Sequence, residues 1–192
     1  MRAAALAALA CAAAQAHAQP ATEQMATCFA CHGISGQSQM PEIPSLGGQP
    51  SFYAITQLFL FREGRRGKTV MLDAARGLTD DDLRALSAAI EKLPPPAAPA
   101  EAPTRDRFER GRAKAGEHRC GTCHGADFAG GDQVPRLANQ REDYLVKSLR
   151  EFKSGARLGY TAAMAEVLAG LSDDNLVDVA HYLAYLPRAA GR

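Results

Sequence analysis

CFACHG at residues 28–33 and CGTCHG at residues 120–125 are the stretches that decide how this chain of 192 residues folds. The likeness between them continues downstream in the same order. It runs through IPSL at 43–46 and VPRL at 134–137, then GLTDDDL at 77–83 and GLSDDNL at 170–176. Matches in this order indicate a tandem duplication of one unit of about 75–85 residues, a small domain whose core a cofactor would complete.

A proline-rich segment separates the two units. Residues 94–103 read PPPAAPAEAP, and proline at this density predicts an extended, semi-rigid spacer that forms no helix. We therefore expect a first domain over residues 19–93 and a second over residues 104–192.

The first 18 residues have the pattern of a secretory signal peptide. Arg2 is followed by an Ala/Leu-rich run over residues 3–14, which is shorter than a membrane span. Ala16-His17-Ala18 fits a cleavage site, with Gln19 as the first mature residue. The sequence thus predicts export to the periplasm, the alternative being an uncleaved anchor.

Each unit is predicted to be helical, which makes the fold all-α. Thr79 and Ser172 are good N-cap residues, and apolar residues follow each of them at helical spacing. A middle helix is expected over residues 51–63 and 142–154. A first helix should run into each Cys pair, from about Thr22 and from about Thr104.

Each Cys-x-x-Cys-His pentapeptide is the signature of covalent c-type haem attachment. The two thiols add to the haem vinyl groups, and the adjacent His becomes an axial iron ligand. The predicted residues are Cys28, Cys31 and His32 in the first unit and Cys120, Cys123 and His124 in the second. A four-Cys zinc site, a thioredoxin-type redox pair and structural disulfides are the alternatives.

The second axial ligand is expected to be a methionine. Met71 and Met164 occupy matching positions downstream of the two histidines, and a thioether is a soft, neutral ligand that raises the potential of haem iron. The alternative is that both are ordinary core methionines. Met40 is a rival to Met71, but it has no counterpart in the second unit. Met25 lies too close to the attachment site.

Other residues have secondary roles in this interpretation. The carbonyls of Pro44 and Pro135 are candidate acceptors for the His ring N–H. Tyr53 and Tyr144 either bond a propionate or simply pack. Basic residues near the middle helices form a solvated face or pair with propionates or an acidic partner, namely Arg62, Arg65, Arg66, Lys68, Arg150, Lys153 and Arg157. His181 is predicted to be at the surface or partly packed.

Taken together, these motifs resemble the dihaem cytochromes of the cytochrome c4 family over residues 19 to 187. The resemblance implies two class I cytochrome c domains with two covalently bound haem c groups. It also implies the axial pairs His32/Met71 and His124/Met164.

The resemblance further implies a carrier of single electrons rather than an enzyme. Its partners would be redox proteins, such as a quinol-oxidising complex, a terminal oxidase or a dehydrogenase. A dehydrogenase subunit is the main alternative and a dihaem peroxidase a lesser one. Nearly balanced charge, 22 Lys and Arg against 21 Asp and Glu, argues against a nucleic-acid partner. No segment of the mature chain is expected to span a membrane, and peripheral membrane association is left open.

Overall fold

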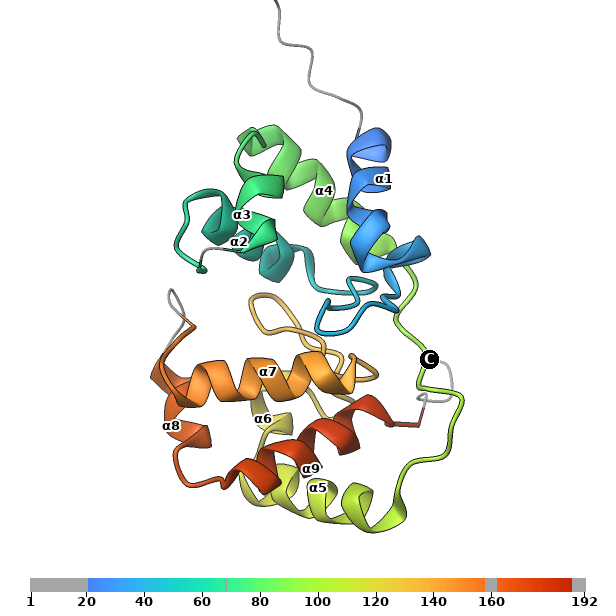
Figure 1. Ribbon diagram of the computed structural model, residues 1–192, viewed down its shortest axis with the longest axis vertical. Coiled ribbons are helices and arrows are strands. Elements are labelled where there is room, and N and C mark those ends of the chain that lie inside the picture. The colour runs from blue at the N-terminus through green and yellow to red at the C-terminus, as the bar shows by residue number, and fades with distance from the viewer. Residues whose placement is uncertain (1–20, 68, 158–161, 188–192) are drawn as a thin grey trace, which may run out of the picture.

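A computed structural model of the protein describes residues 21–67, 69–157 and 162–187, and the predicted signal peptide lies outside these residues. Within this part of the chain there are helices and no β-strands, which confirms the predicted all-α class. The two halves of the duplication form two stacked helical bodies, blue to green and yellow to red in Figure 1. None of the described helices is long and apolar enough to cross a membrane.

The first half contains four α-helices and one short 3-10 helix. They are α1 (Ala21–His32), η1 (Ile34–Gly36), α2 (Ser51–Arg62), α3 (Val70–Ala75) and α4 (Asp80–Lys92). Helix α4 buries Leu83, Leu86 and Ile90 against α1 and α2, as the apolar stripe in the sequence predicts.

The second half repeats this arrangement with a separate core. Its helices are α5 (Arg105–Glu117), α6 (Gly121–His124), α7 (Glu142–Lys153), α8 (Ala162–Leu168) and α9 (Asp173–Ala184). Helix α9 buries Leu176, Val179 and Leu183 among α5 and α7. Each half has its own hydrophobic core, which is the criterion for a structural domain.

The last helix of each half begins at a capping box. The Thr79 hydroxyl accepts a hydrogen bond from the Asp82 N–H, while the Asp82 carboxylate accepts one from the Thr79 N–H. Ser172 and Asn175 make the same reciprocal pair at α9. These bonds satisfy N–H groups that a helix start otherwise leaves without partners.

The first helix of the second half does not run into its Cys pair as predicted. It ends where Arg119 adopts φ 51°, and the Cys120 N–H bonds the Ala115 carbonyl while the Arg119 N–H bonds the Gly116 carbonyl. This pattern is a Schellman motif, which satisfies the last carbonyls and turns the chain away from the helix axis. The Cys pair therefore begins a separate short helix, α6.

Two further short helices, α3 and α8, were not predicted, and they carry the two candidate methionines. Met71 lies on α3 and Met164 on α8, and both pack against the core of their own half. Helices of six and seven residues are too short to show a clear apolar periodicity in sequence.

The proline-rich segment contains no helix, as predicted. Its start lies against the first half, and it then runs down beside the second half to α5 (Figure 1). A Cβ atom on Gly47 would be 2.1 Å from the Pro94 carbonyl oxygen, and one on Gly48 would be 3.1 Å from the Pro95 ring. Pro96 is buried. These contacts pack the start of the segment on the first half, whereas residues 97–103 are exposed.

In the second half, α5 and α9 cross at Gly111. A Cβ atom added there would be 2.0 Å from the Asp178 carbonyl oxygen and 2.8 Å from the Tyr182 Cβ. The backbones of the two helices can approach this closely only because position 111 has no side chain.

We therefore expect Gly111→Ala to lower the free energy of unfolding by about 1–3 kcal/mol, because the added methyl group forces the crossing apart. Gly116→Ala on the same helix is the matched control, since no atom lies within 4 Å of the added Cβ. It should raise stability by about 0.5–1 kcal/mol through helix propensity. Guanidinium unfolding of the haem-loaded protein measures both. A Gly111 variant as stable as the Gly116 variant would contradict the tight crossing.

Candidate haem sites

The two candidate axial histidines occupy equivalent, buried positions. His32 ends α1 and His124 ends α6. The Nδ1 atom of His32 lies 2.8 Å from the Pro44 carbonyl oxygen, and that of His124 lies 3.0 Å from the Pro135 oxygen. A carbonyl oxygen only accepts, so Nδ1 carries the proton and Nε2 presents its lone pair. This is how proteins orient a metal-binding imidazole.

Burial keeps both imidazoles in the form that binds a metal. Desolvation lowers the pKa of His32 and of His124, and the bond to the proline carbonyl offsets this only in part. A neutral ring has a free lone pair at neutral pH, whereas a protonated ring has none.

The four cysteines of the described residues form no disulfide bonds and stay in two separate pairs. Cys28, Cys31 and Cys120 are half-buried and Cys123 is exposed. Desolvation raises the pKa of Cys28 and of Cys120, so both thiols are protonated at neutral pH. In the described residues no three His, Cys, Asp or Glu side chains gather as a metal site. The four cysteines thus do not converge on one zinc ion.

The burial of the methionines distinguishes the candidates for the second axial ligand in the first half. Met71 and Met164 are half-buried at the edge of their cores, whereas Met25 is buried inside one. Met40 is 46% exposed. A half-buried thioether at a core edge suits a ligand that faces a cofactor, and an exposed one does not. The assignment of Met71 and Met164 as ligands stays a prediction.

Equivalent arginines and tyrosines from the two halves meet at the domain interface. Arg66 donates to Tyr144 Oη at 2.9 Å, and its repeat counterpart Arg157 donates to Tyr53 Oη at 3.5 Å. Arg66 also donates to Gln57 Oε1 at 2.6 Å. The hydroxyls of both predicted tyrosines therefore face the opposite domain, which the sequence did not indicate.

This cluster carries a strong positive potential. Burial would raise the pKa of the Tyr144 phenol, but the charges of Arg66 and Arg157 outweigh it and lower the pKa to about 7. A site that favours the phenolate to this extent also favours carboxylates. Among the basic residues near the middle helices, these two arginines stay predicted partners of haem propionates.

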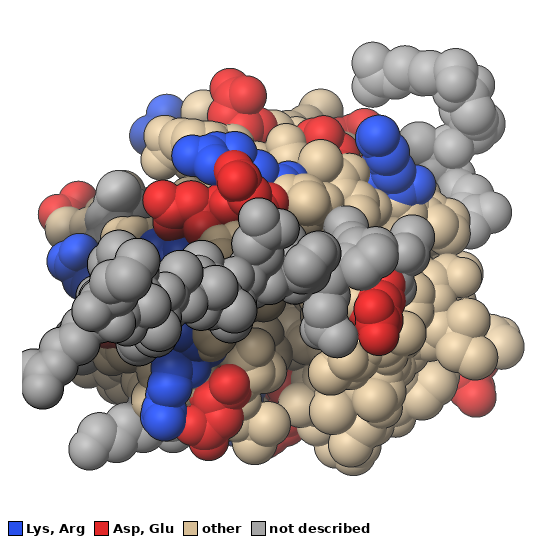
Figure 2. All heavy atoms as spheres, turned by 90° about the horizontal axis from the view of Figure 1, so that it is seen from above, with Lys and Arg blue, Asp and Glu red and all other residues tan. Residues whose placement is uncertain are grey.

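Three of the other basic residues of this set have local partners, namely Arg62, Arg150 and Lys153. Arg62 pairs with Glu63 and Asp80, and Arg150 pairs with Asp173. Lys153 donates to the Leu171 carbonyl, Arg65 is exposed, and Lys68 lies outside the described residues. The face shown in Figure 2 accordingly mixes acidic and basic side chains.

His181 is not at the surface or partly packed, as predicted, but 3% exposed. Its Nδ1 lies 2.9 Å from a Glu142 carboxylate oxygen, and its Nε2 accepts from the Thr104 N–H at 3.0 Å. These two bonds satisfy both ring nitrogens inside the second domain and tie the start of that domain to α7 and α9. His181 is thus a structural residue rather than a haem ligand.

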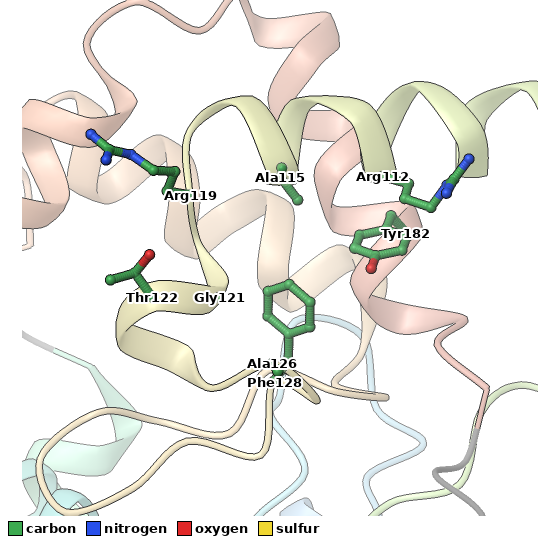
Figure 3. A pocket seen from close by; sticks show the side chains of 9 residues that line it. Arg112, Ala115, Arg119, Gly121, Thr122, Ala126, Phe128 and Tyr182 are labelled. Carbon is green, nitrogen blue, oxygen red and sulfur yellow. The ribbon is translucent and has the colours of Figure 1, made fainter.

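A shallow hollow lies beside the second Cys pair, between α5, α6 and α9 (Figure 3). Phe128 and Tyr182 form part of its wall, with ring centroids 5.8 Å apart and edge to face. A second hollow lies between α2 and α4 in the first half. Neither is lined by a candidate axial residue, so the expected slot between each His and Met stays a prediction.

Comparison with known proteins places this geometry in a family. The cytochrome c family profile matches residues 18–94 and again residues 108–187. Cytochrome c4 of Thiocapsa roseopersicina is 35% identical over 164 residues, which cover 81% of this chain and 85% of that protein. The chain belongs to the cytochrome c4 family.

Other relatives agree with this membership. The structure of reduced recombinant cytochrome c4 from Pseudomonas stutzeri matches with a TM-score of 0.78 and 26% identity, covering 87% of this chain and 97% of that one. The thiosulfate dehydrogenase electron acceptor of Thiomonas intermedia (strain K12) is 32% identical over 177 residues, 87% of this chain and 82% of that protein.

Membership of the family settles the cofactor and the general role. Two cytochrome c domains carry two covalently bound haem c groups, and the protein is an electron carrier rather than an enzyme. The residues described above fit that cofactor, because each half offers two free thiols and a buried imidazole with its Nε2 lone pair available.

Proposed function

We propose that this protein is a periplasmic carrier that passes single electrons between respiratory redox partners. The observation that supports it is the repeated His–Pro bond, which prepares one buried imidazole in each half for iron. Haem iron held by two protein ligands would supply one-electron exchange and would offer no vacant position for substrate. Such a centre suits outer-sphere electron transfer.

In this proposal, different residues of each half attach the haem, bind its iron and pair with its propionates. The cysteines Cys28, Cys31, Cys120 and Cys123 anchor the haem covalently, while His32 with Met71 and His124 with Met164 bind iron. The half-buried thioethers on α3 and α8 add a soft ligand that favours the ferrous state and raises the potential. Arg66 and Arg157 hold propionate charge near the domain interface.

The proposed domain organisation follows the duplication. Residues 1–18 direct export and are removed, residues 19–93 and 104–192 each hold one haem, and residues 94–103 connect them. The separate cores of the two halves support this division. Contacts between the halves support transfer between the haems within one molecule, since the domains are packed rather than merely tethered.

A second candidate function is that of electron acceptor for a periplasmic dehydrogenase. It is favoured by relatives named as thiosulfate dehydrogenase electron acceptors, which are 32% and 30% identical over most of their length. Such encounters between redox proteins use small, weak interfaces, so one carrier can serve both roles.

The ligand assignment is tested by Met71→His. We expect about half of the sulfur-to-iron charge-transfer absorption of the ferric protein to disappear, and one of the two potentials to fall, because imidazole stabilises ferric iron more than a thioether does. Optical redox titration measures both effects. Met40→Ala is the control and should change neither. Loss of the band in the Met40 variant, with its retention in the Met71 variant, would reverse the assignment.

Export and haem loading are tested by the intact mass of the protein from the periplasm of a bacterium that attaches haem c. The expected mass is that of a chain beginning at Gln19 plus two haems. The double variant Cys120→Ala/Cys123→Ala should lose the mass of one haem, because its second half has no thiols. A protein that retains residues 1–18 would refute the proposed processing.

The second candidate is tested by mixing oxidised protein with thiosulfate and a purified thiosulfate dehydrogenase. Rapid reduction of both haems, followed by stopped-flow absorbance, is expected if the protein accepts electrons from that enzyme. An enzyme that reduces its own acceptor but not this protein would rule this candidate out.

A further inference from the structure

Two buried glutamines make reciprocal contacts across the domain interface. Gln140 accepts from the Ser45 N–H at 2.7 Å and donates to the Ser45 carbonyl at 2.8 Å. Its repeat counterpart Gln49 accepts from the Arg136 N–H at 3.1 Å and donates to the Arg136 carbonyl at 3.0 Å. We call each pair of bonds an amide bracket. Each bracket joins a side chain of one domain to a single backbone residue of the other.

The residue held by each bracket directly follows the proline that binds the candidate axial histidine. The Ser45 N–H and the Pro44 carbonyl belong to one peptide group, and that carbonyl accepts from His32 Nδ1 at 2.8 Å. In the second half, the Arg136 N–H and the Pro135 carbonyl form the peptide group that faces His124 at 3.0 Å. Each imidazole is therefore one peptide group away from the glutamine of the opposite domain.

A peptide group transmits polarisation between its two ends. Its partial double bond couples the N–H to the carbonyl, so an acceptor at the N–H increases the negative charge on the oxygen. Chains of hydrogen bonds strengthen one another in this way, most of all where water is excluded. Ser45 is 2% exposed, and both glutamines are buried as well. The chain through Ser45 thus lies where such coupling is strongest, whereas Arg136 in the other chain is half-buried.

We propose that Gln140 tunes the haem of the first domain through Ser45, Pro44 and His32, and that Gln49 tunes the haem of the second domain through Arg136, Pro135 and His124. The two glutamines are positioning residues, and the inference rests on the proposed role of the histidines as iron ligands. A more strongly held ring N–H makes the imidazole more electron-rich, which favours ferric iron and lowers the potential. Each domain thereby sets part of the potential of the other domain's haem.

A purely structural role for the brackets would give a different result. The interface has further contacts, including Arg66 with Tyr144 and the ion pair of Lys147 with Glu42 at 2.9 Å. Loosening the interface at any of these points would expose both haems to water and change both potentials. Tuning through a bracket instead changes one potential only, that of the haem in the opposite domain.

The test is Gln140→Met, which keeps the side-chain volume and removes the amide. The reduction equilibrium of the first-domain haem should shift toward the ferrous form by about 2- to 3-fold, or roughly 20–30 mV at 59 mV per tenfold, while the second-domain haem stays unchanged. Gln49→Met should shift the second-domain haem in the same direction and leave the first-domain haem unchanged. This shift should be smaller, because the hydrogen bonds of Gln49 are longer than those of Gln140. Each potential is read from the shifted haem methyl NMR signals, assigned through contacts to side chains of their own domain.

Two matched variants complete the design. Lys147→Met removes the cross-domain ion pair with Glu42 but leaves both brackets intact, so it should not produce the one-sided shift. Gln140→Glu keeps an acceptor oxygen opposite the Ser45 N–H, so the first-domain potential should remain at or below that of the wild type. If Gln140→Met does not fold, Gln140→Asn takes its place. The shorter side chain of Asn cannot reach Ser45, so we expect the same shift of the first-domain potential.

The inference is overturned if the glutamine variants shift both haems equally, shift the haem of their own domain, or shift neither. It is also overturned if Gln140→Glu raises the first-domain potential as Gln140→Met does. Failure of the proposed function is recognised separately. In that case the wild-type ferric protein itself lacks the spectrum of His and Met ligation, whatever the glutamine variants do.

Discussion

The hydrogen bond from a buried imidazole N–H to a proline carbonyl is the interaction on which the rest of this structure depends. A histidine can bind iron through Nε2 only if its proton resides on Nδ1, and the carbonyls of Pro44 and Pro135 enforce that arrangement twice. Burial of His32 and His124 lowers their pKa and keeps them neutral. The Cys-x-x-Cys-His segment places each ring, and the proline carbonyl orients it.

The duplication has consequences beyond doubling the site. Equivalent residues meet at the domain interface in reciprocal pairs, so the two halves contact each other as the subunits of a symmetric dimer do. Arg66 reaches Tyr144 as Arg157 reaches Tyr53, across the same pseudo-twofold relation. Hydrogen bonds join the two halves, buried between Gln140 and Ser45 and partly exposed elsewhere, while each half keeps its own apolar core. Such bonds are directional, and they specify one docking arrangement more sharply than apolar contact does.

A fixed arrangement of the two halves suits an electron carrier. Transfer between two centres in one molecule depends on a constant separation, and here both the interface bonds and the linker maintain it. The linker packs on residues 47–48, directly before Gln49, so the segment that joins the domains also supports one of the two brackets. The peptide groups that orient the imidazoles are thereby held from both domains.

The sequence by itself determined much of what depends on neighbouring residues. Each Cys-x-x-Cys-His motif is contiguous, the N-caps at Thr79 and Ser172 act on their own helix turns, and the apolar stripes follow one helix period. The duplication was visible for the same reason, because both copies keep their order along the chain. The Schellman turn at Arg119 was not predicted, because the residue with positive φ in such a turn is usually glycine and here it is arginine.

Only the tertiary structure decided which distant groups meet. The contact between Gln140 and Ser45 joins residues of different domains. Gln140 bonds the backbone of Ser45, and because almost every residue type has the same backbone groups, the sequence cannot identify this partner. His181 was misplaced for a related reason, since Glu142 and Thr104, which satisfy its ring, come from other segments of the second domain. Local chemistry can be read along a chain, whereas the burial and pairing of polar groups depend on which segments the fold brings together.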